Sequence, residues 1–224
     1  MDILWHVIHF VTMSKFLVLF FIFGILPILI SLSVRKGRAW QTIGYAVIAV
    51  LALVSVFFGT GIAVGVVHAF GEKGAATITG SYGTSTVYND HDVVGYHVLL
   101  RTADGKVVET SFEDDDFNIY PSKNAVIYPG VGDHFTVYYL RRFPDDFIIV
   151  DNDDSPWATA LRCGKLRDAV QEANAKYEFD RGNTSYRTAY VAVINDLLDN
   201  KCVADESERD EFRHDLENVR AGQP

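Results

Sequence analysis

The stretch that decides the predicted fold lies near the N-terminus and reads FLVLFFIFGILPILISLSV (residues 16–34), RKGR (35–38) and AWQTIGYAVIAVLALVSVFFGTGIAVGVVHAF (39–70). Neither long run contains a charged residue. A bilayer core about 30 Å thick is crossed by about 20 apolar residues, and its hydrocarbon admits only backbone whose hydrogen bonds close internally. The pattern therefore predicts a transmembrane hairpin with helices at about 16–34 and 42–64.

The connection between the two runs predicts the sidedness of this hairpin. Residues 35–38 hold three positive charges, whereas the outer flanks carry Lys15 on one side and the opposite charges of Glu72 and Lys73 on the other. Short cytoplasmic loops of membrane proteins are enriched in Lys and Arg. We therefore expect a bacterial inner-membrane protein whose two termini and soluble domain are periplasmic.

Two glycines near the end of the second run have a spacing that favours helix contacts. Gly61 and Gly65 lie four residues apart, and small residues at this spacing let two helices approach closely. The contact predicted from them lies within the hairpin or joins two copies in a homodimer through the transmembrane helices. The alternative is that glycine is simply common in such helices.

The charge of the remaining chain restricts its partners. From Glu72 to Pro224 the sequence holds 16 basic and 28 acidic residues, a net charge of −12, while the whole chain carries −9. A surface of that sign repels nucleic acid phosphates and anionic lipid headgroups alike. We therefore expect no nucleic acid partner and favour a cationic protein.

After residue 71 the continuous apolarity gives way to short alternating runs, which indicate β-structure. The clearest pair, 94–102 and 107–112, is joined by Ala103-Asp104-Gly105-Lys106, whose Asp-Gly suits a tight hairpin turn. Weak strands are predicted at 75–82 and 84–88, and further strands at 124–128, 135–140 and 147–150. Together they predict a small antiparallel barrel or sandwich over residues 72–154.

This region also carries a recognisable order of turn and strand residues. It reads Tyr96-x-Val98, Asp104-Gly105-Lys106, Tyr128-Pro129-x-Val131-Gly132-Asp133-x-Phe135-x-Val137-Tyr138-Tyr139 and Phe143-Pro144. Over residues 75–151 the order resembles a family of small membrane-anchored bacterial β-domains of unknown function. The resemblance implies a β-domain between two membrane helices, whereas here both predicted helices come first. It implies no catalytic residues.

Residues 155–224 are predicted to form a helical domain. Ser155 suits a helix cap and Pro156 the first helical position, and apolar residues then recur at spacings of three and four. A second helix is predicted at about 184–200 and a shorter one after Asp205. The predicted fold class is thus an α+β membrane protein, with a transmembrane hairpin at 1–71, the β-domain, and a helical hairpin plus a short helix.

Two cysteines lie at related places in this helical domain. Cys163 is near the start of its first helix and Cys202 just after the end of its second, so an antiparallel hairpin brings them together. A disulfide is expected outside the cytoplasm, and its loop of about 40 residues would contribute about 4 kcal/mol. The alternatives are a reactive thiol or a metal pair, although neither cysteine has a Cys-x-x-Cys partner or a histidine at ligand spacing.

Carboxylates form three clusters in the predicted loops, and we take them as the candidate partner-binding surface: Glu113, Asp114, Asp115, Asp116; Asp145, Asp146; Asp151, Asp153, Asp154. Such clusters suit calcium, but the run from Asp151 lacks the glycine and glutamate of a helix-loop-helix calcium site. Paired carboxylates for glycoside hydrolysis stay open as an alternative. No nucleophile motif accompanies them. We therefore predict no catalytic residue, cofactor or resident metal.

Three functions follow as hypotheses. The first is a membrane-anchored, non-enzymatic periplasmic module that binds a cationic protein, most specifically an immunity protein of a toxin-antitoxin pair that neutralises a toxin at the envelope. The second is a structural or accessory subunit of an envelope complex. The third is a calcium-dependent envelope enzyme.

Overall fold

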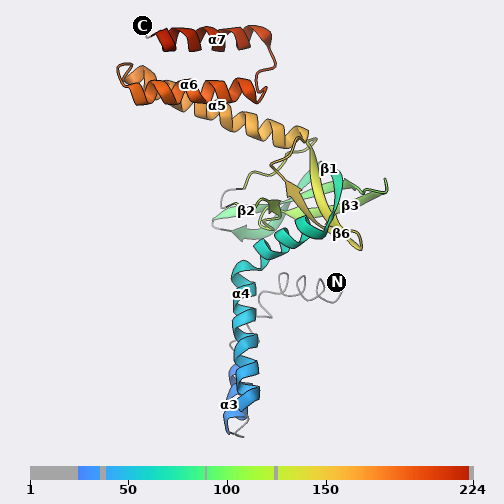
Figure 1. Ribbon diagram of the computed structural model, residues 1–224. Coiled ribbons are helices and arrows are strands. Elements are labelled where there is room, and N and C mark those ends of the chain that lie inside the picture. Colours follow the sequence, from blue (N-terminus) through green and yellow to red (C-terminus); the bar gives the residue numbers. More distant parts are fainter. Residues whose placement is uncertain (1–24, 36–38, 89, 124–125, 222–224) are drawn as a thin grey trace. The chain divides into compact units, whose positions relative to one another are not determined.

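The computed structural model describes residues 25–35, 39–88, 90–123 and 126–221, with backbone only at residues 33, 49 and 51–59. The chain divides into two compact units, residues 1–150 and 151–224 (Figure 1).

The first unit begins with two helices, α3 (Leu26–Arg35) and α4 (Ala39–Phe70). Among the residues that the structure describes, no helix combines the length and the apolar character needed to cross a membrane. The predicted transmembrane hairpin is therefore wrong. Helix α3 has only 10 residues, and residues 16–24 of the first predicted span lie outside the described part of the chain.

The end of α4, from residue 64 onward, gives a physical reason for the part of this difference that concerns the last turns of the helix. Val64 and Val67 are 3% and 2% exposed, and they pack with Ile148 of strand β6 (Phe143–Val150) in one hydrophobic cluster. The ring of His68 stacks on Tyr120 with the two centroids 3.6 Å apart. The apolar side chains at this end therefore complete a protein core, a role that continuous apolarity in a sequence does not distinguish from burial in lipid.

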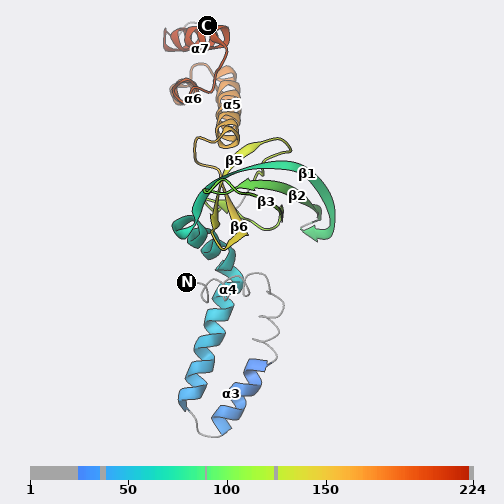
Figure 2. The same cartoon turned by 90° about the vertical axis from the view of Figure 1, so that its right-hand side faces the viewer.

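Six strands form one sheet in the order β3-β2-β1-β5-β6-β4. The strands other than β6 are β1 (Glu72–Tyr88), β2 (His91–Arg101), β3 (Val107–Glu113), β4 (Ile119–Tyr120) and β5 (His134–Leu140). All neighbours are antiparallel except β4 and β6, so the sheet is mixed rather than purely antiparallel as predicted. Strands β3 and β4 stand at opposite ends of the sheet yet are consecutive in the chain, so the sheet curls round on itself (Figure 2).

Several predicted strand boundaries also differ from the structure, and β6 begins at Phe143 rather than at residue 147. The predicted strands 75–82 and 84–88 form one long strand, β1, because pairing with β2 resumes beyond an irregularity at Gly83. Residues 126–128, the described part of the predicted strand 124–128, belong to no strand. The turn between β2 and β3 lies where Asp104-Gly105 predicts it, and Gly105 has a φ of +83°.

Aromatic side chains fill the interior of the curled sheet. The ring of Phe112 lies 6.0 Å from Phe147 and 5.0 Å from both Tyr96 and Tyr128. Aliphatic side chains from β2, β5 and β6 surround them, and Leu100, Val137 and Ile149 are fully buried. Strands that are distant in the chain therefore share one core.

A single tyrosine connects β1, β5 and the β2–β3 turn at the start of β1. Tyr139 is 1% exposed, and its hydroxyl accepts a hydrogen bond from the Ala103 N–H at 2.8 Å and donates one to the Glu72 carboxylate at 3.2 Å. Glu72 also pairs with Arg141 at 3.4 Å. The β2–β3 turn, β1 and β5 are thereby held in one polar network.

The second unit consists of α5 (Pro156–Phe179), α6 (Thr184–Asp199) and α7 (Glu206–Ala221). The Ser155 side chain accepts from the Ala158 N–H, and Asn183 caps α6 in the same manner. The helices share one core, which contains Val170, Ala173, Tyr177, Tyr190, Ile194, Leu197, Val203, Leu216 and Val219.

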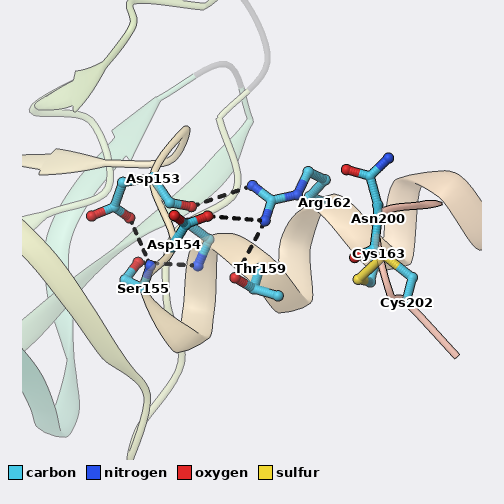
Figure 3. A network of polar contacts seen from close by, with 9 residues as sticks. Asp153, Asp154, Ser155, Thr159, Arg162, Cys163, Asn200 and Cys202 are labelled. Atoms are coloured by element: carbon cyan, nitrogen blue, oxygen red, sulfur yellow. Dashed lines mark hydrogen bonds and ion pairs between the residues drawn. A yellow bond between two sulfur atoms is a disulfide. The ribbon is translucent and has the colours of Figure 1, made fainter. Parts of the chain in front are cut away.

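The predicted disulfide is confirmed. Cys163 and Cys202 are bonded, with their Cα atoms 5.1 Å apart (Figure 3). Arg167, one turn further along α5, donates to the Cys202 carbonyl at 3.2 Å and pairs with Glu208 of α7. The reactive thiol and the metal pair, the two alternatives for these cysteines, are therefore wrong.

Candidate functional site

The first acidic cluster forms a hydrogen-bonded turn between β3 and β4. The Asp114 carboxylate accepts from the Val94 N–H at 3.2 Å, while the Asp114 N–H donates to the Val94 carbonyl at 3.0 Å. The Asp116 carboxylate accepts from the Glu113 N–H at 2.8 Å. Two carboxylates therefore hold the backbone of the turn, and these bonds leave the carboxylates of Glu113 and Asp115 unused.

The carboxylates of this turn create a strong negative potential. Partial burial raises the pKa of Glu113, and the charges of Asp115, Asp116 and Asp114 raise it further. Burial also raises the pKa of Tyr96, with Asp114 adding to the shift. A positive charge placed at the turn would relieve this repulsion.

Exposed aromatic surface lies directly beside the acids. Phe117, the residue after the turn, has a φ of +51°, a left-handed conformation that is unusual for a bulky side chain. Its ring makes an edge contact with Tyr88 at 5.8 Å between centroids. Tyr88 is 49% exposed at the tip of the β1–β2 hairpin, and its neighbour Val87 is 63% exposed. Strain of this kind is found at functional sites, where surrounding contacts maintain it.

The hairpin tip contributes two more carboxylates to the same place. Asp90 and Asp92 are both exposed, and Asp92 pairs with Val87 across the hairpin. We call the combined surface the acidic pole, and it consists of Tyr88, Asp90, Asp92, Glu113, Asp114, Asp115, Asp116 and Phe117. The two segments that form it, 83–95 and 110–118, contain six acidic residues and no Lys or Arg.

Basic residues occupy the far ends of the same strands. Register places Lys73 opposite Tyr138, at the start of β1, and Arg101 opposite Val107, at the end of β2. Lys106 lies in the β2–β3 turn, and residues 141–142, both Arg, lie in the β5–β6 turn. The acidic pole is therefore separated along the strands from most of the basic residues of the β-sheet.

The other predicted acidic residues are placed elsewhere. Asp145 and Asp146 lie in β6, which pairs with β5 and β4. Asp151, Asp153 and Asp154 belong to the second unit, where the Asp153 carboxylate accepts from the Ser155 N–H at 3.0 Å. Asp154 pairs with Arg162 at 3.7 Å, so these carboxylates lie at the start of α5 (Figure 3).

The structure also bears on the predicted glycine contact and on metal binding, within the residues that it describes. Among the described residues, a Cβ atom added to Gly61 or Gly65 would meet nothing within 4 Å, and a contact within the hairpin stays a prediction because residues 1–24 lie outside the described part of the chain. Contact between copies at these glycines stays untested. In the part of the chain that the structure describes, no three His, Cys, Asp or Glu side chains converge to hold a metal ion.

Sequence reasoning missed the hairpin half of the acidic pole. No motif marks Tyr88, Asp90 and Asp92, although Asp90 has the φ of +63° that Asp and Asn tolerate in tight turns. Phe117 carried no sequence signal, because its conformation depends on the turn before it.

Comparison with protein-family models, with curated proteins and with solved structures finds no match to this chain. The resemblance to small bacterial β-domains therefore stays a prediction, and the geometry of the acidic pole is the basis for a functional proposal.

Proposed function

We propose that this protein is a non-enzymatic binding module whose acidic pole docks a cationic protein. The observation that carries the proposal is the gathering of six carboxylates on the two segments that hold the exposed ring of Tyr88 and the half-buried ring of Phe117. Exposed aromatic side chains anchor protein interfaces, while surrounding charges select the partner and accelerate its approach.

The two parts of the acidic pole would contribute differently to binding. Exposed ion pairs are worth about 0–1 kcal/mol each and weaken in salt, so the carboxylates mainly steer and orient the partner. A Lys or Arg side chain over the ring of Tyr88 adds about 0.5–1 kcal/mol at an exposed site. The partner expected from this chemistry presents basic residues around an apolar or cationic anchor.

The confirmed disulfide supports an oxidising compartment for the protein. Such bonds persist in the periplasm and outside cells and are rare in the cytosol. We therefore propose the bacterial periplasm as the place of binding. For the partner we propose a cationic toxin that acts at the envelope, since a small acidic protein located there is suited to intercept one.

Two matched charge variants of the full-length protein test this proposal. The site variant carries Asp90→Asn, Asp92→Asn and Asp115→Asn, which spare the carboxylates that hold the turn. The control carries Asp168→Asn, Glu211→Gln and Glu217→Gln, three exposed helical residues of the second unit. Both variants change the net charge from −9 to about −6, so a nonspecific charge effect would weaken both equally.

Affinity capture from a periplasmic extract in moderate salt, with each protein as bait, supplies the measurement. We expect a basic protein that the wild type and the control retain and that the site variant loses. Equal retention by all three baits, or retention of anionic polymers alone, would contradict the proposal.

A further inference from the structure

One edge of the sheet next to the acidic pole has unpaired backbone groups. Strand β3 stands at the end of the strand order, and among the described residues β2 is the only strand that pairs with it. Its register with β2 runs without a shift from Arg101 opposite Val107 to Gly95 opposite Glu113. The edge is therefore regular over its whole length.

The hydrogen bonds at both ends of this pair fix which groups point outward. Asp114 donates its N–H to Val94 at one end, and Thr102 donates its N–H to Lys106 at the other. Because bonded and non-bonded pairs alternate along antiparallel strands, Val108, Thr110 and Phe112 bond to β2. The N–H and C=O groups of Val107, Glu109 and Ser111 consequently point away from β2.

The unpaired edge of β3 ends at Glu113, which belongs to the acidic pole. Both outward groups of Glu113 are occupied, because its N–H donates to the Asp116 carboxylate at 2.8 Å and its carbonyl accepts from the Asp116 N–H at 3.0 Å. The open part is thus Val107 to Ser111, a stretch of about 17 Å at about 3.4 Å per residue. The side chains at positions 107, 109 and 111 are all exposed.

The second unpaired edge in the same region is less suitable for pairing. Strand β1 pairs with β5 as far as Thr77 and Ile78 bridges to Val131, while the distal half of β1 has register shifts between Ile78 and Gly80 and between Gly83 and Val87. Irregularities of this kind discourage the addition of another strand. Strand β3 has none.

We propose that the cationic partner binds as an extended segment that adds a strand to the edge of β3. This inference rests on the proposed function, because the acidic pole at the end of β3 supplies the charge that selects basic residues in the added segment. Backbone hydrogen bonds to Val107, Glu109 and Ser111 would provide affinity, and alternate side chains would provide specificity.

A second copy of this chain is a poorer occupant of the same edge. Antiparallel pairing of two β3 strands centred on Glu109 would place two carboxylates directly opposite each other, with Cβ atoms about 5 Å apart. Each chain also carries a net charge of −9. A basic segment meets neither obstacle.

The test uses the full-length oxidised protein and a capped heptapeptide of alternating lysine and valine as the probe. Amide hydrogen exchange is measured with and without the peptide. We expect exchange at Glu109 and Ser111 to slow by more than about tenfold, while Val108 and Thr110, already bonded to β2, change by less than about twofold. Unchanged exchange at Glu109 and Ser111 under saturating peptide would overturn the inference.

A matched pair of variants gives a second readout. Ser111→Pro removes an outward N–H that β2 does not use and should weaken peptide binding by more than about tenfold, whereas Ser111→Ala should stay within about twofold. Exchange protection in β2 shows whether the proline variant is folded, and if it is not, the exchange measurement on the wild type decides alone. Equal affinity of folded Ser111→Pro and Ser111→Ala would also overturn the inference.

Two outcomes separate this inference from the proposed function. In the first outcome, peptide binding weakens in salt and in the site variant, but the β3 edge is not protected from exchange. This outcome refutes strand addition and leaves the proposed function standing. In the second outcome, the peptide protects the β3 edge equally at low and high salt and in the wild type and the site variant. This outcome refutes the selection of basic residues by the acidic pole.

Discussion

Removing the bond between Cys163 and Cys202 should destabilise the second unit by about 4 kcal/mol. The two residues are 39 positions apart. On the chain-entropy relation, closing a loop of this length removes about 13 cal/mol/K from the unfolded chain, which is about 4 kcal/mol at room temperature. The perturbation is the double variant Cys163→Ala, Cys202→Ala, or reduction of the wild-type protein by a thiol.

Amide hydrogen exchange resolves this effect unit by unit. With about 1.4 kcal/mol for each factor of ten, exchange of the slowest amides in α5, α6 and α7 should accelerate by about 700-fold. The amides of β1 to β6 serve as the internal control, because the disulfide lies wholly within residues 151–224. Acceleration of less than about tenfold in the helices, or equal acceleration in the strands, would refute the reasoning.

Three further outcomes are expected. Tyr139→Phe should cost the β-sheet about 1–2 kcal/mol in denaturant unfolding, because the Ala103 N–H loses its acceptor; an unchanged midpoint would count against this network. Glu113→Gln should raise the melting temperature at pH 7 but not at pH 3. The pKa of Glu113 is raised in the folded protein, so ionisation of this carboxyl destabilises the fold as pH rises through its pKa, and the variant removes that destabilisation. Gly95→Ala should lower the melting temperature, since the added Cβ would overlap the ring of Tyr82, and adding Tyr82→Ala should lessen the loss.

Features set by local sequence could be predicted well. The positions of Cys163 and Cys202 follow from the lengths of two helices and the turn between them, and the disulfide is present. The turn at Asp104-Gly105 is likewise local, since the positive φ of Gly105 is a property of two adjacent residues. In both cases the interacting residues are fixed by the chain between them.

Features set by distant contacts could not be predicted. Strand β4 has only two residues, Ile119 and Tyr120, and pairs in parallel with β6, so no alternating pattern announces it. The predicted transmembrane hairpin failed for a related reason. Burial of Val64 and Val67 against Ile148 depends on a strand about 80 residues further along the chain.

The roles of individual residues in the candidate site were even harder to predict from the sequence, because residues of one type in a single run have different roles. From the sequence, residues 113–116 form one acidic patch, yet Asp114 and Asp116 hold the turn through backbone N–H groups while Asp115 takes no part in those bonds. Composition therefore predicts the negative electrostatic potential of the patch, but it does not predict the role of each residue. Neutralising Asp115 changes charge without removing a bond that holds the turn, whereas replacing the Asp116 side chain also releases the outward N–H of Glu113, while the Glu113 carbonyl keeps its bond to the Asp116 N–H. If the partner adds a strand, the two substitutions should have different effects. Neutralising Asp115 should weaken the attraction of the partner, whereas replacing Asp116 should also change where the added strand ends.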